Sequence, residues 1–550
     1  MRRSHQIAGH ERGDRLSSLR DVVLGHVLSF LDAKEIARAT TLSRRWRDVL
    51  AIVHTVSLGL EQPKQPLAAD DLASALFNRV LRQAPAAVPV PLRALRARVC
   101  MGYHSPEVDE TTMDQCVSYA LMHAGPELEL DLRLGSDTTI CKHPNPAAED
   151  LSLRVPPRKP TQTNAEDHSL LAPDDDDDGD DVGSSSEEDL GGDREHALPT
   201  RRFNYVNREY TVPWGIFSCA ALRSLHLGSC RLSPPAAFRM PWLQELRLTH
   251  APDEEEHVQR LVSACPHLVD LSLEACQTVT TLSVLGNIHL RSLALLCCHK
   301  LAKVSVDATE LRAFEYRGAV PSDSFLTIVG SSPSITSCKI DICVICVGEA
   351  TSEDELGKLG SFLQHFASST KHLHLSCALM CSCFVRLPAF TSLCHLQLIG
   401  RVPHSGDDPA AVAVGMSKIL RQAPNLETLS LLFEIKRRDP NKHDYYSGHN
   451  EAELLDPHLL HYNKYDTIDV PASLSLALPT CLGTRLRKIN LLHYQGGRAQ
   501  RMLVKFLVCN AKVLEKLYCG FAEGPMWIQT RLKREMEDWA LNETTNKEFR

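Results

Sequence analysis

The sequence of 550 residues predicts an α/β solenoid, with parallel strands on a concave face and helices on a convex face, preceded by three short helices. The first observation behind this prediction is a pattern, L-x-x-L-x-L-x-x-C, that recurs about every 21 to 25 residues after residue 222. The second is a group of helix-start signals within the first 50 residues. Because the length exceeds that of one ordinary domain, a repeat array or several domains are required.

The N-terminal helices are predicted from start signals and apolar periodicity. Ser18 and Asp21 have capping-box spacing, and the apolar run that follows predicts a first helix over about 19–31. Similar start signals at Asp32 and Ser43 predict two further short helices. A unit of this size rarely holds a core of its own, since domains below about 40 residues usually need a disulfide, a metal or a partner.

The first helix has more apolar surface than two short helices can cover. Val22, Val23, Val27 and Phe30 belong to this surplus. An apolar helix face without an internal partner is suited to docking on another protein. The alternative interpretation is that these helices only cap the end of the solenoid.

Three N-terminal segments resemble the F-box of the large plant F-box/leucine-rich-repeat family: DRLS at 14–17, LSFL at 28–31 and LSRRWR at 42–47. The resemblance implies that residues 14–50 form a helical hook that docks on the Skp-type adaptor of a cullin-RING ubiquitin ligase. The family usually has a proline where this chain has Arg20. By the same resemblance, the adaptor-binding residues are Leu16, Leu19, Val23, Val27, Leu28, Phe30, Leu31, Ile36 and Trp46.

Residues 51–137 are predicted to form degenerate early repeats. The segment 54–58 alternates as a strand does, 70–82 has a capped helical pattern, and 113–134 is a helix followed by a strand. Residues 138–200 then carry prolines and the acidic run DDDDDGDD, a composition that predicts a disordered insertion.

The acidic insertion has two interpretations. It is a solvated spacer, or it is a site of phosphorylation, because Ser184, Ser185 and Ser186 each precede an acidic residue by three positions. Its aspartates lack the alternation and closing glutamate of a calcium loop, so no calcium site is expected.

Residues 201–520 are predicted to form the regular solenoid, with helices over 257–265 and 415–423 and inserted loops at about 403–408 and 436–465. Residues 1–13 are expected to be disordered, and residues 521–550 to form a capping helix and tail. The inward positions of the best repeats are Leu222, Leu225, Leu227, Cys230, Leu243, Leu246, Leu248, Leu268, Leu271, Leu273, Cys276, Leu290, Leu293, Leu295 and Cys298.

Several classes of function are not expected. The net charge of -8 gives no reason to expect nucleic-acid binding, and no apolar run approaches the length of a membrane span. No nucleotide, hydrolase-elbow or zinc-protease motif is present, so no catalytic residue, cofactor or metal is predicted. Many of the 19 cysteines fall in repeat phase, as buried thiols of an intracellular protein would, in the nucleus or cytoplasm.

Two functions from different classes therefore remain. The first is a non-catalytic substrate receptor of an SCF-type ubiquitin ligase, in which the F-box holds the adaptor and the repeats hold a target protein. The second is a repeat scaffold that binds proteins outside any ligase. The exposed repeat positions mix charged, polar and aromatic side chains in no pattern that identifies the target.

Overall fold

The computed structural model describes residues 18–31, 35, 38–39, 45–46, 53–59, 91–99, 110–134, 210–307, 309–329, 334–343, 353–380, 386–402, 410–434, 468–471, 474, 478–522, 524–540 and 544–550. The chain divides into two compact units, residues 1–144 with 208–550 and residues 145–207. Outside the described residues lie the second unit and the predicted N-terminal tail, acidic insertion, both inserted loops, the helix over 70–82, and Ser184, Ser185 and Ser186.

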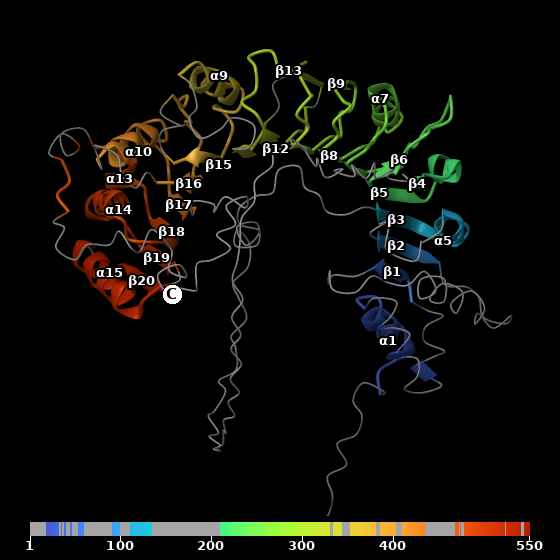
Figure 1. The fold of residues 1–550 in the computed structure, drawn as a ribbon, viewed down its shortest axis with the longest axis horizontal. Coiled ribbons are helices and arrows are strands. Elements are labelled where there is room, and N and C mark those ends of the chain that lie inside the picture. The colour runs from blue at the N-terminus through green and yellow to red at the C-terminus, as the bar shows by residue number, and fades with distance from the viewer. Residues whose placement is uncertain are drawn as a thin grey trace, which may run out of the picture. The chain divides into compact units, whose positions relative to one another are not determined.

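One parallel sheet runs through the first unit, and its strands follow one another in chain order (Figure 1). This order arises because each repeat contributes one strand and then returns behind the sheet to start the next. The predicted fold class is confirmed. The strands are β1 Thr55–Gly59, β2 Leu92–Val99, β3 Ala124–Leu134, β5 Leu222–Gly228, β7 Glu245–Thr249, β8 Asp270–Glu274, β10 Ser292–Leu296, β12 Ala313–Gly318, β14 Ser337–Ile342, β15 His372–Leu379, β16 His395–Arg401, β17 Thr428–Phe433, β18 Lys488–Tyr494, β19 Lys516–Phe521 and β20 Asn546–Phe549.

From α5 onward helices line the convex side of this sheet, while its strands line the concave side, and α1 lies beyond the first strand (Figure 1). The sequence places most of them within a few residues of their observed bounds; the predicted helix over 257–265, for example, is α7. The helices are α1 Asp21–Leu28, α5 Glu110–Met122, α7 Glu255–Ser263, α9 Glu353–Gln364, α10 Ala411–Arg421, α13 Thr480–Thr484, α14 Arg498–Asn510 and α15 Met526–Trp539, with a 3-10 helix, η2, over Trp214–Ser218.

Between α7 and α9 the convex side carries strands in place of helices (Figure 1). Three of them, β9 Thr281–Val284, β11 Lys303–Val306 and β13 Leu326–Ile328, pair in parallel as a second sheet. The repeats here are among the shortest in the chain, so the return segment is too short for a helix with its two connecting turns. A further short pair, β4 Tyr210–Thr211 with β6 Cys230–Arg231, lies earlier in the stack.

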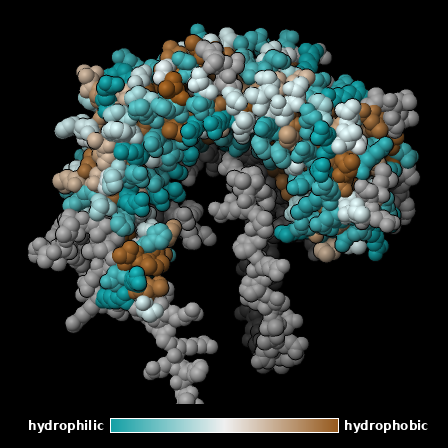
Figure 2. Space-filling view, turned by 180° about the vertical axis from the view of Figure 1, so that it is seen from behind, coloured by the Kyte–Doolittle hydropathy of each residue, from teal (hydrophilic) through white to brown (hydrophobic). Residues whose placement is uncertain are grey.

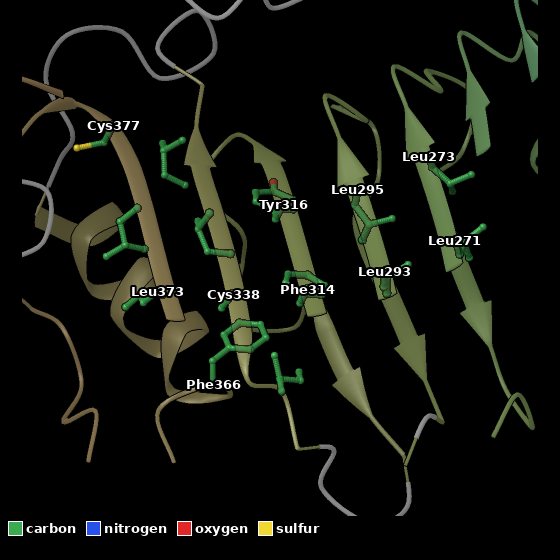
Figure 3. Packing of buried hydrophobic residues seen from close by; sticks show 14 of the residues in the cluster. Leu271, Leu273, Leu293, Leu295, Phe314, Tyr316, Cys338, Phe366, Leu373 and Cys377 are labelled. Carbon is green, nitrogen blue, oxygen red and sulfur yellow. The ribbon is translucent and has the colours of Figure 1, made fainter. Parts of the chain in front are cut away.

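The repeat leucines form one continuous core. Leu271, Leu273, Leu293 and Leu295 are all buried, and Figure 3 shows the corresponding side chains of successive strands on the same side of the sheet. One repeat strand, β15, is absent from the sequence prediction, because the buried Thr370 stands where its first leucine would be. The Thr370 hydroxyl donates to the Ile335 carbonyl, which compensates for burying a polar group at a core position.

The corners that follow the strands have a repeated backbone conformation. Ser229, His250, Ala275 and Cys297 each have a φ between 51° and 55°, in the left-handed region. Their amides each donate to a carbonyl of the next strand, as Ser229 N–H does to Thr249 O at 2.9 Å. This conformation turns the chain beneath the sheet and directs the next residue inward.

Candidate functional site

The helix α1 begins later than the sequence predicts. Its N-cap is Arg20, with φ -64° and ψ 148°, and no side chain caps the helix there. Asp21 instead lies in the first turn, where a carboxylate stabilises the helix dipole. Arg45 contacts Asp21 at 2.7 Å and also donates to the Leu19 carbonyl, so it fastens the third predicted helical segment to the start of α1.

One face of α1 packs into a small core of its own. Leu24 and Leu28 are fully buried with Val53, and Leu19, Leu31, Ala39 and Trp46 are half-buried against them. This cluster, which we call the F-box core, is separate from the repeat core among the described residues.

Leu28 therefore requires a correction. It was predicted as an adaptor contact, but it is buried in the F-box core because it lies one helical turn after Leu24 on the same face. Leu19, Leu31 and Trp46 are half-buried against the same core and support the fold of this segment. Leu16 and Ile36 lie outside the described residues.

The other face of α1 carries large exposed apolar side chains, which we call the α1 patch. Val22 is 73% exposed, Val23 43%, Val27 39% and Phe30 78%. Figure 2 shows strongly apolar side chains gathered on this part of the surface. Four such side chains within nine residues are unusual, since isolated exposed apolar residues are common but clusters mark interaction sites.

The α1 patch differs slightly from the residues predicted for adaptor binding. Val23, Val27 and Phe30 belong to both sets, and Val22, which the sequence analysis assigned to the apolar surplus but not to adaptor binding, is exposed with them. The Phe30 ring lies edge-on to the His26 ring at 5.0 Å, which places an aromatic pair at the end of the patch. Val23 and Val27 each precede a buried leucine, Leu24 or Leu28, by one position, so helical phase alone could have separated the two faces.

The concave face of the sheet is the second candidate site. Strand positions that alternate with core leucines point to this face. From β2 to β14 many of its charges are paired. The pairs across strands are Arg96 with Glu129, Arg98 with Asp131, His226 with Glu245, Lys339 with Glu315, and Arg317 with Asp341, and Arg133 pairs with Asp131 within β3.

One group on this face has the composition of a catalytic triad without its geometry. The Nε2 atom of His226 lies 2.8 Å from Glu245 and 3.3 Å from the Ser224 hydroxyl, which itself donates to Glu245 at 3.0 Å. A proton relay needs the hydroxyl and the carboxylate on different ring nitrogens. Burial acts to raise the pKa of Glu245, but His226, Ser224 and Arg247 outweigh it and hold that pKa below its ordinary value. The group is a cross-strand hydrogen-bonded cluster of Ser224, His226 and Glu245.

Most of the buried cysteines belong to the repeat core, while Cys297 and Cys343 form a small cluster of their own. Burial raises the pKa of the Cys116, Cys230 and Cys265 thiols to about 12, so they stay neutral at physiological pH. Cys230 and Cys276 lie just after strand corners and donate to carbonyls of neighbouring strands. In the described part of the chain, no three His, Cys, Asp or Glu side chains are grouped to hold a metal, and no helix could span a membrane.

Comparisons with known proteins match both parts of the structure. The F-box domain model matches residues 16–55, and the model of "FBD-associated F-box protein At5g56370, LRR repeats" matches residues 197–334. Among Arabidopsis thaliana proteins, "F-box/LRR-repeat protein At2g42720" is 41% identical over 70 residues, 12% of this chain and 16% of the relative. "F-box protein At3g59000" is 29% identical over 126 residues, 22% of this chain and 25% of the relative.

These matches cover a quarter or less of each of these two relatives' length. They nevertheless agree with the α1 unit and with the stacked strands that follow it. Over residues 16–55 the chain is therefore similar to F-box domains, and over residues 197–334 to the leucine-rich repeats of plant FBD-associated F-box proteins.

Proposed function

We propose that the chain is the substrate-recognition subunit of an SCF-type ubiquitin ligase. In this proposal the α1 patch docks on a Skp-type adaptor, and the repeats hold a target protein near the conjugating enzyme. Such a subunit needs no catalytic residue, because holding the target close raises its effective concentration. The proposal includes an intracellular location, in the nucleus, the cytoplasm or both.

The exposure of the α1 patch is the observation that supports this proposal. Burying four apolar side chains that now face water would stabilise a complex, at roughly 25 cal/mol per Å² of apolar area removed from water. A helix that only capped the solenoid would bury this face against its own repeats. The α1 patch instead faces away from the F-box core, and its residues belong to neither buried core.

Co-purification of the chain with a Skp-type adaptor tests the proposal. Val27→Glu and Phe30→Glu should each weaken adaptor binding by at least about thirtyfold, since truncating or charging a central apolar contact commonly costs 2 kcal/mol or more. Leu285→Glu is the matched control, because Leu285 is 58% exposed on the convex side of the repeats.

The control variant should bind the adaptor as the unchanged chain does, and all three variants should keep the thermal unfolding of the repeats. Adaptor binding that survives both α1 substitutions would assign the chain to the alternative, a repeat scaffold that acts outside a ligase.

A further inference from the structure

The concave face changes in charge after β14. Strands β15, β16, β17 and β18 are adjacent in the sheet (Figure 1), and their described residues include no aspartate or glutamate. The exposed and half-exposed side chains on their concave side include His372, His374, His395 and Lys488, with hydroxyl and amide side chains between them. We call this surface the β15–β18 strip.

Three of these side chains lie in one row across the sheet. His372 is in register with His395, His395 with Thr428, and Thr428 with Lys488. The two imidazole rings stack with centroids 4.4 Å apart and planes only 3° apart. Neighbouring strands are about 4.8 Å apart, so Lys488 follows His395 by about 10 Å along the row.

The electrostatic surroundings favour a negative charge at this row. The pKa of His395 is lowered by burial first, then by His372 and by Lys488, while Glu427 at the start of β17 acts in the opposite direction. Two stacked imidazoles resist a second positive charge unless an anion shares the site. Among the described residues, strands β15 to β18 place no aspartate or glutamate in the row itself, and Glu427, one position before Thr428, is the carboxylate that acts on His395.

We propose that the β15–β18 strip binds an extended, carboxylate-rich segment of a target protein, with Asp or Glu side chains directed at His372, His395 and Lys488. Side chains on one side of an extended peptide recur about every 6.6 Å, so two or three carboxylates fit the length of the row. Binding of the segment by the strip does not depend on the proposed function. Only the consequence for the bound protein, that it is held near the conjugating enzyme, rests on that proposal.

The arginine content of the strip favours carboxylate over phosphate as the ligand. Phosphate groups are recognised best by free arginine forks. Arg487, beside the row, is already paired with Glu515 at 2.6 Å. Arg401 lies six residues beyond His395 on β16, which is about 20 Å along the strand.

Fluorescence anisotropy with the full chain and a labelled peptide of alternating glutamate and serine tests the proposal. The peptide should bind at low ionic strength and weaken as salt is added. Lys488→Gln should weaken binding about fivefold, the upper range for an exposed ion pair. Lys303→Gln, on the convex sheet, is the matched control and should have no effect.

The histidines predict a pH dependence with a definite sign. An anion stabilises the protonated imidazole, so binding takes up protons and affinity should rise as pH falls from 8 to about 6, where the peptide carboxylates stay ionised. In the double variant His372→Gln with His395→Gln, this dependence should be lost. Thermal unfolding of each variant checks that the repeats remain folded.

Several results would overturn the proposal. These are equal binding of a glutamine-serine peptide, equal losses in the Lys303 and Lys488 variants, or a phosphoserine peptide that binds more than tenfold tighter. Peptide binding that appears only after deletion of residues 145–207 would assign the strip to the chain's own acidic segment. Phe30→Glu should lose the adaptor and keep the peptide, so a failure here and a failure of the ligase proposal are distinguishable.

Discussion

Individual residues of α1 divide between fold and recognition by helical phase alone. Leu24 and Leu28 form one face and are buried, while Val23 and Val27, each one position earlier, are exposed. The family resemblance placed Leu28 and Val27 in the same functional set, because a sequence motif marks which residues belong to a unit and not which face they occupy. The exposed fractions of the side chains separate the two roles.

Arg20 is the position where the chain departs from the family pattern. Its φ of -64° is the value that a proline ring imposes, and it lies just before the first helical residue. Arg20→Pro should therefore be tolerated and stabilise the F-box core by about 0.4–1 kcal/mol, through a less flexible unfolded chain. Chemical denaturation monitored in the N-terminal segment would measure this, and a loss of stability would show that the arginine side chain or amide is required.

At the scale of the element, the left-handed backbone conformation at the strand corners costs free energy of folding. Substitution of the corner residue by glycine can recover part of that free energy. Ser229 occupies the left-handed region at φ 54°, where residues other than glycine are disfavoured by about 1–2 kcal/mol. Ser229→Gly should raise the free energy of unfolding by about 0.5–1 kcal/mol, after allowance for the flexibility of glycine in the unfolded chain.

The same substitution within a strand provides the control for the corner. Ser272 lies in the middle of β8, so Ser272→Gly should lower stability by about 0.5–1 kcal/mol. Urea unfolding curves of the two variants compare the signs directly. If both substitutions lower the free energy of unfolding, the contacts of the Ser229 side chain stabilise the fold by more than its left-handed backbone conformation destabilises it.

The elements predicted from sequence are those with a leucine signature. Most of the L-x-L strands and several of the amphipathic helices follow from period alone and appear within a few residues of the prediction, whereas β15 and α9 were not predicted. The strands β9, β11 and β13 were missed because each has only three or four residues, which is too few for a periodic signal. The C-terminal strand β20, NKEF, was missed because it reads as polar and pairs only at the edge of the sheet.

The candidate sites were predictable to different degrees. The surplus of apolar surface on α1 follows from composition and periodicity, and the exposed valines agree with it. The β15–β18 strip was not predictable, because it depends on which residues of distant segments come into register. His372 and His395 are neighbours only because their strands pair, although 22 residues of sequence separate them.

At the scale of the whole molecule, the two separate cores predict that a destabilising substitution in one core leaves the other core folded. Leu28→Ala should destabilise the F-box core by about 2–5 kcal/mol, as expected for a buried leucine. Hydrogen exchange should accelerate in residues 18–31 and stay unchanged in β5 to β10. A simultaneous loss of protection in those strands would show that the two cores unfold as one.

The junction between the cores is very short. Val53 belongs to the F-box core, and Val56, three residues later, already belongs to the repeat core and to the strand β1. Such a junction is too short to act as a flexible linker. The distance from the α1 patch to a protein bound on the concave face would then depend on the number of strands between them. Inserting or deleting one repeat would change that distance by the spacing of one strand.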